Sequence, residues 1–369
     1  IQFSNPQTSA DLLSNSGRVF VQKSQLGGGS PLIRGFSTNR LLITVDGVRL
    51  NNAIFRGGNV QNVLSINPFN IEKTEVILGS GSVIYGSDAI GGVMNFYTTT
   101  PKLSESKTPI FSARSTVRHA TANTEKTAHL DFNVGFQKWG FHTSASLSDF
   151  GDLKMGVHGP DDYLSLFYSE QINGRDVMVS NPTPRVQKFT NFQQIHLAQK
   201  VLFKATDDLK FDLGIQYSTT SDYPRYDRLA THDSEGVLRY AEWNYGPQEW
   251  LLANMQMTKL SSRSNLYDKI KVSAAYQNFK ESRINRRFNA NTRKIREENV
   301  DAISLNFDFY KTLSTKSNIS YGTEYIYNKV GSAGHSENIR TDATERIDSR
   351  YPDGSKWQTL AAYLSHKYK

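Results

Sequence analysis

The stretch PLIRGFSTNRLLITVDGVRLNN (residues 31–52), followed by FNIEKTEVILGSGSVIYGSDAIGGVMNFYT (residues 69–98), decides the fold of this chain. Two short apolar strands end in tight glycine turns, and a third apolar segment follows a loop rich in glycine and serine. Half of the 26 glycines lie within residues 1–100, and glycine permits turns with positive φ and close approach of backbones. We therefore predict a compact, tightly turned domain over residues 1–100.

From residue 111 onward, apolar and polar side chains alternate, as in LDFNVGF (130–136) and LKFDLGIQY (209–217). We expect about ten strands, near 110–120, 128–137, 140–150, 189–204, 208–221, 247–261, 267–281, 298–312, 316–330 and 356–369. Short connections alternate with long polar ones, which are expected at 151–188, 222–246, 282–297 and 331–355. Short turns at one end and long loops at the other are typical of an outer-membrane β-barrel.

Composition narrows the classes of protein further. The chain has no cysteine, which excludes disulfides and thiolate metal sites. Its net charge is +8, but lysine and arginine do not gather on one helical face, so nucleic acid is not an expected partner. There is no HExxH, GxSxG or P-loop motif, and we expect no enzyme. A soluble β-sandwich or repeat protein is the alternative fold, and the long strands with tyrosines at their ends argue against it.

The first 100 residues resemble the plug of TonB-dependent outer-membrane receptors. The resemblance rests on IRGF (33–36), LLITVDGVRLN (41–51), IEKTEV (71–76) and YGSDAIGGVMNF (85–96), which stand in the family's order, and 5–22 is similar to the plug's first helix and strand. It implies a membrane all-β fold, an antiparallel transmembrane β-barrel of about 22 strands with an N-terminal α+β plug inside its lumen. We accordingly expect residues 101–369 to be the N-terminal part of the barrel. We also expect the chain to be trimmed at both ends, without the family's N-terminal TonB box.

The resemblance also implies a function in the bacterial outer membrane. Members of the family take up scarce, bulky nutrients, and the expected ligand here is an iron chelate or haem, with no intrinsic cofactor. The expected partners are the TonB–ExbB–ExbD energy-coupling complex, outer-membrane lipid and the small-molecule ligand. A host haem protein that delivers the ligand and a surface lipoprotein are further candidates. The alternative is a plugged barrel that binds a protein as an assembly or signalling component of an outer-membrane complex.

Three groups of candidate site residues follow. The amide-rich loop after the VDGVRL motif is expected to face the outside and contact the ligand through Asn51, Asn52, Phe55, Arg56, Asn59 and Gln61. By resemblance to the family's plug–barrel latches, Arg34, Glu72 and Glu75 are expected to pair with charges of the barrel, although Leu78 stands where the family usually has a second arginine. Residues 223–252 resemble a segment of haem receptors, and the candidate haem ligands in the predicted loops are His158, His232 and His335.

Overall fold

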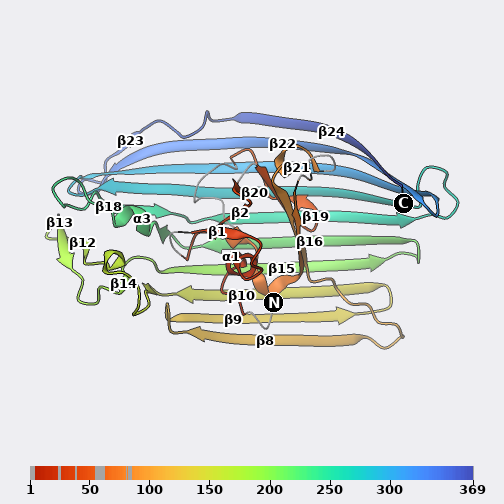
Figure 1. The fold of residues 1–369 in the computed structure, drawn as a ribbon, viewed down its shortest axis with the longest axis horizontal. Coiled ribbons are helices and arrows are strands. Elements are labelled where there is room, and N and C mark those ends of the chain that lie inside the picture. The colour runs from red at the N-terminus through yellow and green to blue at the C-terminus, as the bar shows by residue number, and fades with distance from the viewer. Residues whose placement is uncertain are drawn as a thin grey trace.

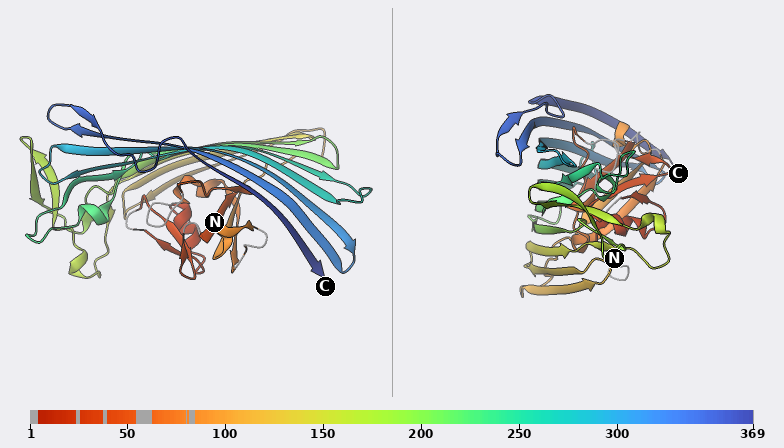
Figure 2. Two further views of the ribbon diagram at one scale, coloured as in Figure 1. Left: turned by 90° about the horizontal axis from the view of Figure 1, so that it is seen from above. Right: turned by 90° about the vertical axis from the view of Figure 1, so that its left-hand side faces the viewer.

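A curved antiparallel sheet makes up most of the molecule. The computed structural model describes residues 5–23, 26–37, 40–54, 63–79, 81 and 85–368. Figure 1 shows the long strands side by side, and Figure 2 shows the N-terminal domain against the concave face of the sheet. The long strands are β8 (Ile110–Ala120), β9 (Glu125–Gly135), β10 (Trp139–Phe150), β15 (Phe192–Lys204), β16 (Leu209–Thr220), β19 (Glu249–Leu260), β20 (Lys269–Arg287), β21 (Thr292–Ser314), β22 (Ser317–Asn338) and β24 (Ser355–Tyr368).

The long strands follow one another as a meander. Each pairs with its predecessor from β8 to β22, in the order β8-β9-β10-β15-β16-β19-β20-β21-β22, and β24 pairs with β22. Every strand predicted from the alternating pattern is present. The predicted loops at 282–297 and, in part, 331–355 are wrong, because β20, β21 and β22 run on as a paired ladder. The apolar alternation stops there, while the backbone hydrogen bonds continue.

The register gives the sheet one apolar outer face. Residues directly opposite each other on neighbouring antiparallel strands share a face. One such row crosses eight strands and consists almost wholly of apolar side chains: Phe141, Val201, Leu213, Met255, Ala274, Leu305, Tyr325 and Leu360. Leu213 and Ile215 are 40% and 55% exposed on β16, whereas Gly214 and Ser218 between and beyond them are buried. The row 209–217 therefore faces outward, as a lipid-facing band requires.

The N-terminal domain consists of short elements in two small sheets. They are α1 (Ser9–Ser14), β1 (Phe20–Gln22), β2 (Ser30–Ile33), β3 (Phe36–Ser37), β4 (Leu41–Val45), β5 (Val48–Arg49), η2 (Val63–Ser65), η3 (Pro68–Asn70), β6 (Ile71–Leu78), η4 (Ser87–Ala89) and β7 (Gly92–Thr98). Helix α1 begins with a capping box formed by Thr8 and Asp11. The second sheet has the order β5-β4-β7-β6, and its β4–β7 pair is parallel.

One apolar core joins this domain to the sheet. Trp250, Leu252 and Ala275 of the sheet belong to the same buried cluster as Ile43 and Phe96 of the N-terminal domain. Much of the remaining concave face is polar and buried, including Thr127, His129, Ser144, Ser146, His196 and Asn254. The concave face is thus the lining of a lumen that the N-terminal domain fills, and we call this domain the plug.

The long connections lie at the end of the sheet opposite the short turns (Figure 1). They contain β11 (Leu153–Lys154), η5 (Asp161–Tyr163), β12 (Phe167–Ile172), β13 (Arg175–Ser180), β14 (Val186–Gln187), β17 (Tyr223–Pro224), α3 (Tyr226–Leu229), β18 (Tyr240–Tyr245) and β23 (Thr344–Arg346). None of the helices in the described ranges has the length and apolar character to span a membrane.

Candidate functional site

The predicted ligand-binding loop begins just after β5. Asn51 is buried, donates through Nδ2 to the Leu41 carbonyl at 2.9 Å and accepts the Ile43 N–H at 3.0 Å. Its side chain holds the β4–β5 hairpin together, and Asn51 also lines the same cavity as Asn52, so its ligand contact stays a prediction. Asn52 accepts the Ile54 N–H at 3.1 Å and lines a 390 Å³ cavity beside the outer loop 347–354. The remaining predicted contacts lie outside the described residues and stay predictions: Phe55, Arg56, Asn59 and Gln61.

The predicted latch residues find no partner on the sheet among the described residues. Arg34 occupies an exposed turn with φ of 50°, and its pairing with a charge of the barrel stays a prediction. Glu72 accepts the Thr100 N–H at 3.0 Å, and Glu75 accepts the Tyr97 hydroxyl at 3.0 Å. Both carboxylates are therefore engaged at the plug's own surface. Sequence motifs place these residues on the plug but do not say which of them meet the sheet.

Among the described residues, two other ion pairs join the plug to the sheet. Arg49 contacts Glu324 of β22 at 2.8 Å, and Asp46 contacts Lys200 of β15 at 3.2 Å. Lys200 also donates to the Thr98 hydroxyl at 2.9 Å. The two plug residues belong to the VDGVRL motif, at the tip and at the end of the β4–β5 hairpin. Their partners on β15 and β22 lie over 120 residues away along the sequence, so the motif alone does not indicate which residues pair.

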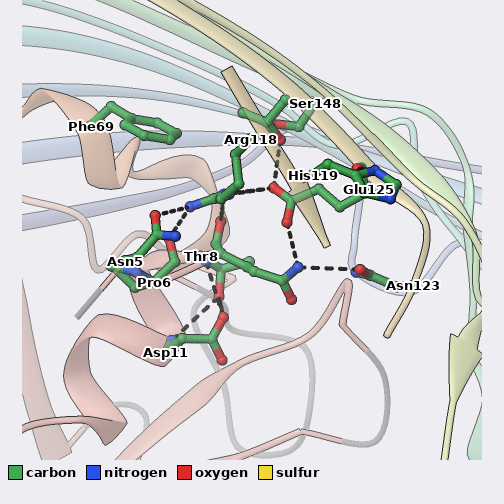
Figure 3. A network of polar contacts seen from close by, with 12 residues as sticks. Asn5, Pro6, Thr8, Asp11, Phe69, Arg118, His119, Asn123, Glu125 and Ser148 are labelled. Carbon is green, nitrogen blue, oxygen red and sulfur yellow. Dashed lines mark hydrogen bonds and ion pairs between the residues drawn. The ribbon is translucent and has the colours of Figure 1, made fainter. Parts of the chain in front are cut away.

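A third link holds the segment that precedes α1 (Figure 3). Arg118 of β8 and Glu125 of β9 form a buried ion pair at 2.7 Å, with 7% and 0% of their side chains exposed. Arg118 donates to the Pro6 carbonyl at 2.8 Å and stacks over the Phe69 ring at 5.0 Å. Gln7 donates through Nε2 to Glu125. We call this set, Arg118 and Glu125 with the plug segments they hold, the stem clamp.

The three candidate haem ligands are not brought together. His158 and His232 are exposed in different outer loops, and His335 is half-buried on β22. In the described ranges, no three His, Cys, Asp or Glu side chains are arranged to hold a metal ion. Haem ligation by these histidines stays a prediction.

A cluster of aromatic side chains lies between the plug and the outer part of the sheet. We call it the aromatic cluster, and its buried members are Leu26, Phe150, Phe192, Tyr223, Trp243 and Tyr245. Two guanidinium groups flank it. Arg225 lies 5.1 Å from the centre of the Trp243 ring, and Arg283 lies 5.4 Å from the centres of both the Trp243 and Tyr245 rings. Cations over aromatic faces gain about 0.5–2 kcal/mol.

The two arginines differ in how their charge is balanced. Arg225 makes two hydrogen bonds to the Asp227 carboxylate, at 2.7 and 3.0 Å, and the pair holds the pKa of Arg225 above its usual value despite its burial. Arg283 has no hydrogen-bond or ion-pair partner among the described residues, and its Nε is buried. A buried, unpaired donor on a cation costs about 1–3 kcal/mol or more. The cluster therefore offers one uncompensated positive charge beside flat aromatic surfaces.

An ion network ties the outer loops together. Arg286 of β20 makes a two-pronged contact with Asp176 of β13, at 2.7 and 2.9 Å, and contacts Glu242 of β18 at 2.8 Å. Arg293 of β21 contacts the same Glu242 at 2.6 Å and Glu337 of β22 at 3.1 Å. The side chains of Arg286 and Asp176 are 4% and 1% exposed. We call these five residues the loop network.

The loop network should loosen in acid. Burial raises the pKa of Glu242, but its contacts with Arg293 and Arg286 outweigh burial and hold the pKa below its usual value. A carboxyl whose folded-state pKa is lowered stabilises the fold at pH above its unfolded value, and that contribution is lost as the pH falls through the folded-state value. We expect amide exchange of β18, which carries Glu242, to accelerate progressively below about pH 4. Hydrogen exchange corrected for the intrinsic pH dependence would measure it, and pH-independent protection would contradict it.

The last long connection, which includes residues 347–354, folds into the lumen instead of extending away from the sheet. Arg350 contacts Glu281 at 3.0 Å and Glu298 at 2.9 Å on the inner face of the sheet. Tyr351 packs beside Ile54 of the plug. The loop 347–354 thus covers the plug where it faces the outer loops, next to the cavity lined by Asn52.

The plug lies in the lumen of a sheet whose apolar face points outward, and folded outer loops lie above it. This arrangement defines the class of gated outer-membrane barrels. The family model "TonB-dependent Receptor Plug Domain" matches residues 1–93. A vitamin B12 transporter, BtuB, from Vibrio vulnificus (strain CMCP6) is 35% identical over 159 residues, which is 42% of this chain and 25% of the transporter.

Solved structures share the architecture. The copper transporter OprC superposes with a TM-score of 0.70 at 14% identity, covering 98% of this chain and 49% of OprC. A haemophore receptor, HasR of Serratia marcescens, solved with its haemophore and haem, superposes with a TM-score of 0.63 at 14% identity, covering 100% of this chain and 48% of HasR. This chain thus spans about half the length of these structures and a quarter of the curated relative.

The chain thus resembles the TonB-dependent outer-membrane receptors over their plug domain and part of their β-barrel. Its location is the bacterial outer membrane, and its fold is the family's plug with part of the β-barrel. The named relatives are transporters and a receptor rather than enzymes.

Proposed function

We propose that the chain provides the plug, residues 1–100, and the N-terminal part of the barrel, residues 101–369, of a TonB-dependent transporter. The transporter takes up a bulky nutrient from outside the cell, and the energy-coupling complex TonB–ExbB–ExbD drives the displacement of the plug. In support, BtuB, the curated relative given above, is named a vitamin B12 transporter, and the superposed structures include a copper transporter.

We further propose that the ligand is an anionic iron chelate with aromatic groups, or haem. The single observation behind this choice is Arg283, whose charge is uncompensated among the described residues beside Trp243 and Tyr245. A guanidinium pairs with carboxylates or catecholate oxygens through charge-assisted hydrogen bonds, and the buried rings of Trp243 and Tyr245 hold Arg283 in place. A superposed structure, HasR, is described with haem.

Titration of the full-length protein with haem and with a ferric catecholate tests this choice. Quenching of tryptophan fluorescence reports binding, because Trp243 lies in the aromatic cluster. We expect Arg283→Ala to weaken binding of the accepted ligand about tenfold or more, the loss of a charge-assisted contact. Arg287→Ala is the matched control, since Arg287 is exposed at the end of the same strand. Equal binding by the two variants would remove Arg283 from the site.

Growth of a deletion strain on haem or on single siderophores as the only iron source identifies the nutrient. Rescue by the wild-type gene on one source supports uptake. A protein that binds no small ligand but co-purifies stably with another outer-membrane protein would instead favour the assembly role.

A further inference from the structure

The inward-folded loop 347–354, which we call the strap, lies between two cavities. Its residues 347–349 line a cavity of about 1130 Å³ that is walled by β20, β21 and β22. Tyr351 and Pro352 of the same strap line the 390 Å³ cavity beside Asn52 of the plug. Ligand pockets usually measure about 300–1,000 Å³, so the cavity at the plug lies at the small end of this range. A bulky nutrient therefore fits beside Asn52 only if the strap moves.

Few backbone hydrogen bonds fasten the strap to the sheet. The pairing of β22 with β24 ends at Val330 and its pairing with β23 begins at His335, so the strap leaves the sheet between these two points. Among the described residues, three strap amides donate to β22: Ile347 to the Gly334 carbonyl at 3.0 Å, Tyr351 to the Ser332 hydroxyl at 3.3 Å and Gly354 to the Val330 carbonyl at 2.9 Å. A segment held by so few backbone hydrogen bonds opens more easily than the strands beside it.

Arg350 supplies the charged contact that holds the strap down. It reaches Glu281 of β20 at 3.0 Å and Glu298 of β21 at 2.9 Å, and the three side chains are 13%, 8% and 0% exposed. Loss of the cation from such a buried pair is strongly destabilising, because the carboxylates stay desolvated. Arg350 is thus the anchor of the strap.

The anchor lies next to the proposed ligand site. Arg283 follows Glu281 by two residues on β20, so its side chain leaves the same face of the sheet about 7 Å farther along the strand. Arg283 has no hydrogen-bond or ion-pair partner in the part of the chain that the structure describes. An anionic group bound at Arg283 therefore lies within reach of the long side chain of Arg350, and it attracts that second guanidinium.

We propose that an anionic group of the ligand takes Arg350 away from Glu281 and Glu298 and thereby releases the strap. This inference rests on the proposed binding of an anionic ligand at Arg283. The ligand gains its second charge-assisted contact, to Arg350, only after the strap has left its closed position. That difference in affinity between the two strap positions shifts the strap toward the open one. Release of the strap joins the two cavities and makes room for a bulky ligand at the plug.

Hydrogen exchange of the full-length receptor tests the anchor. We expect Arg350→Ala to accelerate exchange of the Ile347, Tyr351 and Gly354 amides about tenfold or more, while the β20–β21 ladder keeps its protection. The matched control is Arg346→Ala, since Arg346 is exposed just before the strap and forms no ion pair within the described part of the chain. Equal exchange in the two variants would show that Arg350 does not hold the strap.

The trigger is tested with haem and with a ferric catecholate, each first checked for binding by tryptophan quenching. We expect a bound probe to accelerate exchange of the same three amides in the wild-type receptor. A probe that binds but leaves these amides unchanged or slower would overturn the release of the strap and leave the proposed ligand in place. If neither probe binds, the proposed ligand is wrong and the trigger falls with it.

A variant that keeps Arg350 separates competition from a merely structural contact. Glu281→Gln/Glu298→Gln removes the carboxylates that compete for Arg350, so we expect the accepted probe to bind about three- to tenfold more tightly. The matched control, Glu297→Gln, removes an exposed carboxylate of the same strand that forms no ion pair in the described ranges, and it should leave the affinity unchanged. Weaker or equal binding by the double variant, with the β20–β21 ladder still protected, would overturn the competition for Arg350.

Discussion

Replacing Arg286 with alanine should release the outer hairpin β12–β13 from the sheet. The substitution leaves Asp176 buried without its cation and removes one of the two arginines that hold Glu242. Breaking a buried ion pair from one side costs about 3–5 kcal/mol, because the remaining charge stays desolvated. We expect amides of residues 167–180 to exchange about 100-fold to 5,000-fold faster, while those of β15 and β16 keep their protection.

Two further variants make this prediction sharp. Arg175→Ala removes an exposed arginine next to Asp176 and should leave the exchange of the hairpin unchanged. Arg286→Ala combined with Asp176→Ala removes both members of the buried pair, so the double variant should recover part of the lost protection. If Arg286→Ala and Arg175→Ala exchange alike, the loop network does not hold the hairpin.

The sequence predicts the strands because lipid imposes a strict rule on their outer face. Residues 209–217 alternate with period two, and the structure places Leu213 and Ile215 outward as that pattern requires. The rule ends where the lipid ends. On β20 and β21, residues 282–297 lie beyond the lipid-facing band, where water contacts the outer side of the sheet, so they lack the apolar alternation. The ladder between the two strands nevertheless continues, with 18 opposed pairs that begin at Lys269 and Tyr310.

The candidate site depends on contacts that sequence motifs do not specify. The motif around Asp46 and Arg49 indicates a tight hairpin, and the structure adds that both side chains reach the sheet. Arg34 has the family motif but sits in an exposed turn. Arg283 and Arg286 are close in sequence, yet one lies over aromatic rings and the other between carboxylates. Strand register and loop folding decide such roles.

Loss of the stem clamp should have the second large effect. Arg118→Ala leaves Glu125, whose side chain is fully buried, facing the plug segment without its cation. It also removes the hydrogen bond to the Pro6 carbonyl and the stacking on Phe69. We expect the attachment of residues 5–8 to weaken by about 3–5 kcal/mol. Hydrogen exchange of α1 and ion conductance of the full-length protein in planar bilayers should both rise, because a loosened plug admits water.

The same strand provides a graded control. Arg114 pairs with Asp131 at 2.7 Å and donates one hydrogen bond to the Phe69 carbonyl of the plug at 3.0 Å, but its side chain is 40% exposed. Because exposed pairs contribute about 0–1 kcal/mol, Arg114→Ala should change plug exchange and conductance far less. Glu125→Gln keeps the shape of the clamp while removing the buried negative charge, so it should fall between the two. If Arg118→Ala leaves exchange and conductance at the level of Arg114→Ala, the buried pair does not anchor the plug. The plug would then depend on its apolar core and on the hairpin contacts of Asp46 and Arg49.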